Sequence, residues 1–437
     1  MFLDKLLFKH IDNSALIVFR ILFGLLIFLE SVGAIFTGWV KRTLVDPEFT
    51  FSFIGFEWLQ PLPGPGMYIY YLIMGALSIM VMLGYRYRFA MFTFTLLWTG
   101  TYLMQKSAYN NHYYLLILIS AMMTLLPANR YYSMDVKHNS SLKQNSMPRW
   151  CVLIIIAQLF IVYTYASIAK MYPDWLDLTV GKNLMAVRKD YALIGDVIQQ
   201  EWFLYFITYA GILFDLLIVP ALLWKPTRKW AFFASIFFHL FNSIIFQIGI
   251  FPYLSLAFTL FFFEPKVIQK LFLKNKEFYT KAEVIVPKYN KQLLVLASLY
   301  FIIQIGLPLR HWFIKDDVLW TEEGHRMSWR MMLRSKLGSI RYMVVDKKTG
   351  AKIPVLLDDY LTPKQKRLAS TKPDVIWQFA QKLKKDFATQ GTHISVYVDS
   401  RLSVNGKPFK PFIDPETDLA ELEWDALKHS DWILPSE

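Results

Sequence analysis

The stretch CVLIIIAQLFIVYTYASIAKMYPDW, residues 151–175, is almost wholly apolar from Cys151 to Ala169 and then carries a single lysine, Lys170. An apolar run of about 20 residues is long enough to cross a bilayer as a helix. A charged side chain at the centre of such a helix costs about 2.5–3.5 kcal/mol on insertion scales. Either Lys170 extends its ammonium to the water boundary, or it is partly desolvated and can act as a base.

The composition of the whole chain points to a membrane protein. Of 437 residues, 55% are hydrophobic and 17% aromatic, and the mean hydropathy is +0.32. The formal charge of +13 is spread between apolar runs, which is typical of membrane topology signals and not of a nucleic-acid binder. Cys151 is the only cysteine, which excludes an intrachain disulfide and a thiolate metal cluster. The N-terminal segment MFLDKLLFKHIDN leads into a full-length span and is not expected to be a cleaved signal peptide.

Hydrophobic runs predict eight or nine spans, with nine preferred. The candidates are residues 15–36, 66–83, 89–104, 113–126, 151–169, 203–224, 230–246, 249–263 and 293–309. The fourth and eighth are shorter than a helix needs to cross the hydrocarbon, so they are tilted, extended into their loops or re-entrant.

The distribution of basic residues predicts the orientation of the bundle. With the N-terminus inside, the inner segments hold 18 lysines and arginines and the outer segments hold 6. This asymmetry favours a cytoplasmic N-terminus. Nine spans then place the chain from Arg310 onward outside, in the periplasm or the lumen of an organelle.

The last part of the chain has a different pattern. SIRYMVVDKKTGAKIPVL (339–356) reads as two strands around a turn, and PDVIWQFAQKLKKDFA (373–388) has helical spacing. HISVYVDSRLSVNGKPFKPF (393–412) alternates again, with Asn405 and Gly406 as a turn. The predicted fold is mostly α: a polytopic membrane helix bundle over residues 1–309, followed by a small extracytoplasmic α+β domain over residues 310–437.

This topology brings polar residues from distant segments to the outer leaflet. The set consists of Asn111, His112, Lys170, Arg188, His239 and Asn242, with aromatic neighbours that include Tyr113 and Tyr163. Each has a structural alternative: the lysine can be a boundary anchor, and His239 and Asn242, which share a helix face, can join helices. Together they favour function, because ionisable groups within membranes usually mark a site. Arg20 and Glu30, in the first span, are interpreted as structural.

Such a site could bind a lipid-soluble ring such as a quinone. A desolvated lysine could take a hydroxyl proton, and histidine and asparagine could hold the resulting oxyanion. A transporter with a polar site near the membrane midplane fits the same residues.

Seven segments resemble, in order and spacing, the vitamin K-dependent gamma-carboxylase family from about Ser14 to Pro435. They are SALIVFRILFGLLIFLE, KSAYNNHYYL, IVYTYASIAKMYPDW, FFHLFNSIIFQIGIFPYLSLA, LPLRHW, MSWRMM and DWILP. The resemblance implies an enzyme that couples epoxidation of reduced vitamin K by O2 to carboxylation of protein glutamate with CO2, without a metal. The reduced cofactor would be phylloquinol or menaquinol.

The resemblance also implies roles for individual residues. Lys170 matches the lysine that acts as the hydroquinone base, and Asn111 and His112 match the pair beside it. His239 and Asn242 match the corresponding span, and Arg188 matches a family arginine across a two-residue insertion. The implied partners are a glutamate-containing protein or peptide, the lipid membrane and a quinone-reducing enzyme, but no nucleic acid.

The lone cysteine and the short C-terminal segment differ from animal carboxylases and favour a bacterial inner membrane over the endoplasmic reticulum. They also leave open whether carboxylation accompanies epoxidation. Two alternatives therefore remain: a membrane quinol epoxidase or oxidase that carboxylates nothing, and a non-enzymatic transporter or scaffold.

Overall fold

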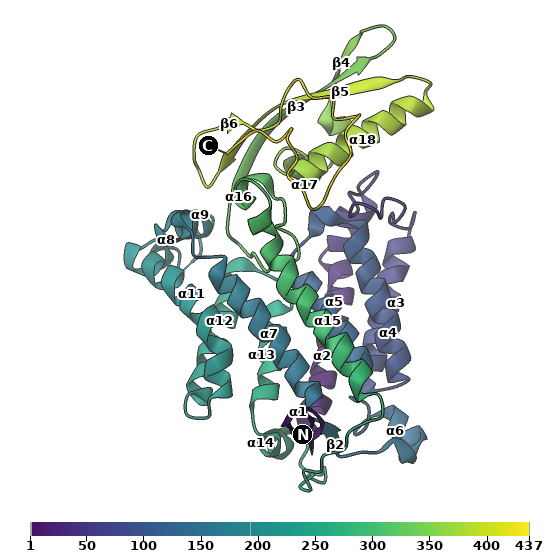
Figure 1. The fold of residues 1–437 in the computed structure, drawn as a ribbon, viewed down its shortest axis with the longest axis vertical. Helices are drawn as coiled ribbons and strands as arrows, with labels where there is room; N and C mark the ends of the chain where they lie inside the picture. The colour runs from purple at the N-terminus through teal and green to yellow at the C-terminus, as the bar shows by residue number, and fades with distance from the viewer. Residues whose placement is uncertain (1, 193, 437) are drawn as a thin grey trace.

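The computed structural model describes residues 2–192 and 194–436. A bundle of long helices forms one end of the molecule, and a small domain of strands and helices lies over the other end (Figure 1). The N-terminus lies at the far end of the bundle from the small domain (Figure 1). The fold is therefore a helical membrane bundle with an α+β domain at its C-terminal end, as the sequence predicts.

The long elements of the bundle correspond to the predicted apolar runs. They are α2 (Ser14–Phe36), α3 (Gly66–Leu83), α4 (Tyr87–Met104), α5 (Asn111–Leu125), α7 (Trp150–Ile168), α11 (Glu201–Leu223), α12 (Arg228–Phe246), α13 (Phe251–Phe258), α14 (Pro265–Phe272) and α15 (Asn290–Leu309). Shorter elements connect them: α1 (Phe2–Phe8), α6 (Met134–His138), α8 (Pro173–Leu176), α9 (Thr179–Ala186), α10 (Gly195–Ile198) and the strands β1 (His10–Asp12) and β2 (Ser146–Pro148).

The number of clear spans is lower than the eight or nine predicted. Within the described residues, six helices are long and apolar enough to cross a membrane, namely α2, α3, α7, α11, α12 and α15. A bent pair that comprises residues 251–262 and α14 raises the number to seven if it counts as one span, with a bend of 119°. The shortfall comes from α5, which has only 15 residues, and from α4, whose threonines and glycine reduce its hydropathy.

Glycines allow α2 and α3 to pack closely. A Cβ atom on Gly24 would lie 2.5 Å from the backbone nitrogen of Met82, and one on Gly75 would lie 2.7 Å from a methyl carbon of Val32. In lipid there is little hydrophobic force between helices, so membrane helices associate mainly through close van der Waals packing. Small residues at the contact allow this packing. Within this pair, α2 contributes Leu29, Glu30 and Gly33 to the larger of the two cavities described below.

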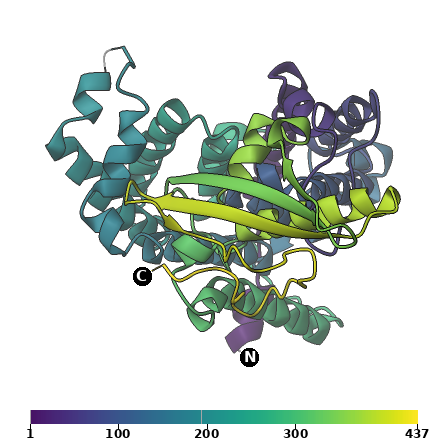
Figure 2. The same ribbon diagram turned by 90° about the horizontal axis from the view of Figure 1, so that it is seen from above.

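The small domain over the end of the bundle, called the outer domain from here on, is an antiparallel sheet with helices on one side. Its elements are β3 (Lys336–Asp346), β4 (Lys352–Val355), β5 (Ile394–Val404), β6 (Lys410–Pro411), α16 (Val318–Thr321), α17 (Pro363–Leu368) and α18 (Pro373–Thr389). The strand order is β4-β3-β5-β6, and the two long strands lie across the helix ends when seen from above (Figure 2). The predicted hairpin, helix and final strand pair are all present, and Val375 and Phe379 of α18 are buried in the domain core.

Buried polar contacts hold the outer domain on the bundle. The Lys106 ammonium lies 2.6 Å from an Asp374 carboxylate oxygen, and Arg326 lies 2.5 Å from the same oxygen. Lys106 belongs to the loop between α4 and α5, whereas Asp374 begins α18. The side-chain amide of Gln378 also donates to the carbonyl of Ser52, at 3.0 Å.

We expect Gly24→Ala to lower the thermal stability of the protein in detergent. The added methyl group collides with backbone atoms of α3 that cannot move independently, and overpacking of this kind costs about 1–3 kcal/mol. Gly306→Ala is the matched control, because a Cβ at Gly306 meets no atom within 4 Å. Equal melting temperatures for the two variants would contradict the close approach of α2 and α3.

Candidate functional site: two adjoining cavities

An apolar cavity of about 300 Å³ lies inside the bundle. This size is at the lower end of the range for small-molecule sites, about 300–1,000 Å³. Phenylalanines of α11 and α12, including Phe214 and Phe238, form much of its wall. Five of the eight residues predicted from sequence also line it: His112, Tyr163, Lys170, His239 and Asn242.

Local structure explains why these side chains meet. Lys170 lies in the turn that follows α7, one helical turn from Pro173, which begins α8. His239 and Asn242 are three residues apart on α12 and therefore share a face. The Tyr163 hydroxyl lies 3.1 Å from His239 Nε2, which connects α7 to α12 across the cavity.

Lys170 is paired with a carboxylate that the sequence reasoning missed. Its ammonium forms a short ion pair with Asp215, which lies within α11 and also lines the cavity. Only 9% of Lys170 and 5% of Asp215 is exposed. Lys170 is therefore neither a boundary anchor nor an isolated amine. The sequence does contain a signal for this pair, because an acid in the middle of an apolar span predicts a charged partner.

His112 is held by an aromatic stack and by a capped helix start. The Asn110 side chain accepts a hydrogen bond from the Tyr113 backbone N–H at 2.7 Å, which caps the N-terminus of α5. His112 follows in the first turn, and its ring stacks on Phe251 with centroids 3.8 Å apart and planes inclined by 15°. The imidazole therefore has a fixed position between α5 and α13.

A second cavity, of about 760 Å³, lies where the bundle meets the outer domain. Five cationic side chains line it: Lys106, Arg326, Arg330, Arg334 and Lys372. Two carboxylates also line it, Glu30 and Glu322. Glu30, interpreted from sequence as structural, thus faces this cavity, whereas Arg20 hydrogen-bonds the carbonyls of Ala128 and Tyr132 in the bundle. The two cavities are very different in character, since one is apolar and the other strongly cationic.

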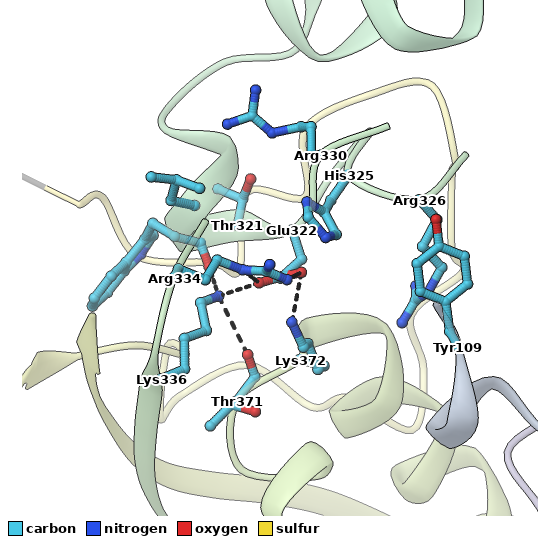
Figure 3. A network of polar contacts seen from close by, with 12 residues as sticks. Tyr109, Thr321, Glu322, His325, Arg326, Arg330, Arg334, Lys336, Thr371 and Lys372 are labelled. Atoms are coloured by element: carbon cyan, nitrogen blue, oxygen red, sulfur yellow. Dashed lines mark hydrogen bonds and ion pairs between the residues drawn. The ribbon is translucent and has the colours of Figure 1, made fainter. Parts of the chain in front are cut away.

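Glu322 lies at the centre of a buried charge cluster at this second cavity (Figure 3). Lys372 and Lys336 lie 2.6 and 2.8 Å from its carboxylate oxygens, and Arg334 binds it with two guanidinium nitrogens. Burial alone would raise the pKa of Glu322, but these cations outweigh it and hold the pKa well below its usual value. The carboxylate is thus charged and compensates only part of the surrounding positive charge.

The two cavities share a wall. Five residues line both: His112, Ile248, Phe251, Met331 and Met332. They come from the start of α5, the turn between α12 and α13, and the segment that precedes β3 in the outer domain. The outer domain therefore completes the apolar cavity inside the bundle.

Three of the predicted residues lie outside the apolar cavity. Asn111 and Tyr113 line the cationic cavity, where the Asn111 amide donates to the Arg330 carbonyl at 3.1 Å. Tyr109 donates to the Asn111 oxygen at 2.7 Å, so the amide positions the loop. Arg188 lines neither cavity, and its Nε donates to the carbonyl of Ile245 at 2.7 Å. Asn111 and His112, adjacent in the first turn of α5, thus both line the cationic cavity, but only His112 also lines the apolar one.

Two family models match the chain. The HTTM domain matches residues 8–266, which is more than half of the chain, and the vitamin K-dependent gamma-carboxylase, lumenal domain, matches residues 289–437. No solved structure matches it. The apolar cavity lies mainly in the first matched segment, and most of the cations of the second cavity lie in the other. The apolar helices make the chain a multi-pass membrane protein, and the matches show that it belongs to the vitamin K-dependent gamma-carboxylase family.

Proposed function

We propose that this protein is a vitamin K-dependent gamma-glutamyl carboxylase. In the overall reaction, a reduced vitamin K (phylloquinol or menaquinol) and O2 give the quinone epoxide and water. A glutamate side chain loses a γ-proton and gains CO2, giving γ-carboxyglutamate. The observation that carries the proposal is the pair of cavities with a common wall, one apolar and one cationic.

The apolar cavity suits a reduced quinone ring. Its phenylalanines provide an apolar surface, and its polar groups are few and gathered near Lys170, His112 and His239. Sites of this kind usually combine an apolar wall with a small number of orienting polar groups. The reduced quinone, when bound, supplies the reducing power that turns O2 into a strong base. The residues of the chain bind the ring, exclude water and accept a proton.

The Lys170–Asp215 pair supports a role for Lys170 as the base. For Lys170 to act as a base, its proton would have to move to the Asp215 carboxylate, which is in direct contact with the ammonium. The amine then accepts a hydroxyl proton from the bound ring, and Asp215 stays beside the new ammonium. Asp215 thus keeps the nitrogen in place in both protonation states, which is the function of a positioning residue.

The imidazoles of His112 and His239 and the amide of Asn242 are suited to bind the oxygen atoms of the quinone ring. His239 Nδ1 is buried with no hydrogen-bond partner among the described residues, and Asn242 lies one turn further along α12. A buried donor without a partner is costly unless a ligand satisfies it. These two residues and His112 would orient the oxygens of the ring, and Tyr163 would fix the His239 ring.

The cationic cavity supports glutamate as the second substrate. A glutamate side chain entering from the outer side carries a carboxylate, which the Arg330 guanidinium could bind, since no carboxylate among the described residues forms an ion pair with it. The reacting carbon would then face the shared wall. We further propose that the N-terminus is cytoplasmic and that the outer domain, as residues 310–437, faces the periplasm or a lumen. A separate quinone-reducing enzyme would regenerate the reduced cofactor.

We expect Lys170→Ala to abolish both products. Removing a general base typically reduces the rate about 10²–10⁴-fold. The measurement is incorporation of labelled CO2 into a short glutamate peptide in the presence of hydroquinone and O2, with epoxide quantified in parallel. The control is Lys225→Ala, which removes an exposed lysine that pairs with Glu264.

Three outcomes separate the candidate functions. Epoxide without fixed label in the unmodified protein would indicate a quinol epoxidase. Neither product from folded protein would indicate a transporter or scaffold. Full activity in Lys170→Ala would exclude this lysine as the base.

We expect Asp215→Asn to lower both stability and activity. Breaking a buried ion pair leaves an uncompensated charge and costs about 3–5 kcal/mol. The double variant Lys170→Met, Asp215→Asn should melt at a higher temperature than Asp215→Asn alone, since it contains no unpaired charge. A double variant that is less stable than the single one would show that the pair does not couple these residues.

We expect Phe251→Ala to uncouple the two products. The reaction written above yields one epoxide for each carboxylated glutamate. Removing the ring that stacks on His112 opens the shared wall and admits water. Water would protonate the strong base formed from O2 before that base reaches glutamate. The ratio of epoxide to fixed CO2 should rise above that of the unmodified protein. Phe237→Ala is the matched control, because Phe237 also lines the apolar cavity but lies outside the shared wall.

A further inference from the structure

The cationic cavity holds more positive charge than a single glutamate carboxylate requires. Five cations and two carboxylates line it, and Lys336 binds Glu322 from behind the wall. Glu322 is the one carboxylate shared by Arg334, Lys336 and Lys372, and burial together with the nearby Arg334 lowers the pKa of both lysines. Charges this close, in surroundings of lower dielectric than water, interact by several kcal/mol and favour an anion in the cavity.

The second acidic group near the cavity does not cancel this excess. Asp374 is shared by Lys106 and Arg326, which leaves one further positive charge. Glu30, the other carboxylate that lines the cavity, comes from α2 in the bundle. The remaining positive charge therefore faces the outer-domain side of the cavity.

Arg330 is the cation with the fewest partners. Among the described residues, no carboxylate forms an ion pair with it, and its Nε is buried with no hydrogen-bond partner. Its Nη1 lies 3.2 Å from His311 Nε2, so one nitrogen of the fork is used. Burial, followed by repulsion from Arg334, lowers the pKa of Arg330 to about 10, which leaves it charged at neutral pH.

His325 provides a second group without a partner. It is 6% exposed, lines the same cavity, and its Nδ1 has no hydrogen-bond partner in the described part of the chain. Burial and the nearby Arg334 hold its pKa well below the usual value, so the ring is neutral. A neutral imidazole can donate one hydrogen bond to an anion beside Arg330.

We infer that the cationic cavity binds a geminal dicarboxylate more tightly than a single carboxylate. One carboxylate of such a ligand would bind Arg330 and His325, and the other would face Lys372 and Arg334, which Glu322 neutralises only in part. The identification of this ligand with the carboxylated product rests on the proposed function. The product would then be held in the cavity that formed it, and its release would be slow compared with that of unreacted glutamate.

The test is calorimetric binding of malonate and propionate to the full chain in detergent. Malonate represents the dicarboxylate head, and propionate represents the unreacted side chain. We expect malonate to bind at least about 10-fold more tightly, and Arg330→Gln to reduce this preference to about 3-fold or less. The control, Arg341→Gln, alters an exposed arginine on β3 that pairs with Asp399, and should leave the preference unchanged.

Similar affinities for the two ligands in the unmodified protein would overturn the inference, even if Arg330→Gln does not fold. A preference that survives Arg330→Gln, or that Arg341→Gln removes equally, would also overturn it. The binding measurement requires neither hydroquinone nor O2. A failure of malonate to bind would therefore not change the outcome of the carboxylation assay. Conversely, a protein that binds malonate but fixes no CO2 would contradict only the proposed function.

Discussion

The ion pair of Asp374 with Lys106 joins the outer domain to the membrane bundle, and Arg326 of the outer domain binds the same carboxylate. Burial alone would raise the pKa of Asp374, but Arg326 and Lys106 outweigh it and hold the pKa well below its usual value. The carboxylate also lies at the start of α18, where the helix dipole favours negative charge. Because Lys106 is in the loop that leads to α5, the same contact fixes His112.

Much of the fold follows from the sequence, because each signal is local. Apolar runs predict the helices, and alternation around the turns at Gly350 and Gly406 predicts the strands of the outer domain. The number of spans was overestimated, since α5 is short and α13 ends at a sharp bend. A bend of this kind depends on packing against neighbouring helices, which hydropathy alone does not report.

The candidate site was partly predictable. Topology brings Lys170, His112, His239 and Asn242 to the same leaflet, and the structure brings them to one cavity. Topology does not distinguish neighbouring residues in the first turn of a helix, so it groups Asn111 with His112 although the Asn111 amide holds the Arg330 backbone. An acid within an apolar span predicts a charged partner for Asp215, but not which one, because Lys170 lies 45 positions away in the chain. The cations of the outer domain carry no spacing signal, since the fold alone assembles them.

The buried Lys170–Asp215 pair changes how the lysine is understood. Replacing a buried ion pair with apolar side chains is often neutral or stabilising, so the pair is weak evidence for a structural role. A charged pair that lines a cavity and costs free energy to bury is more consistent with a chemical role. The same reasoning applies to His239 Nδ1, which is buried without a hydrogen-bond partner in the part of the chain that the structure describes.

The contribution of Met331 and Met332 to the apolar cavity has a consequence for the domain boundary. These methionines belong to the segment matched as a lumenal domain, yet they line a cavity enclosed mainly by helices of the other matched segment. A division of the chain between residues 266 and 289 therefore separates the segments matched by two family models, although residues of both segments line the same apolar cavity. The bundle alone would not enclose this cavity, so substitutions on either side of the division alter the volume of the same cavity.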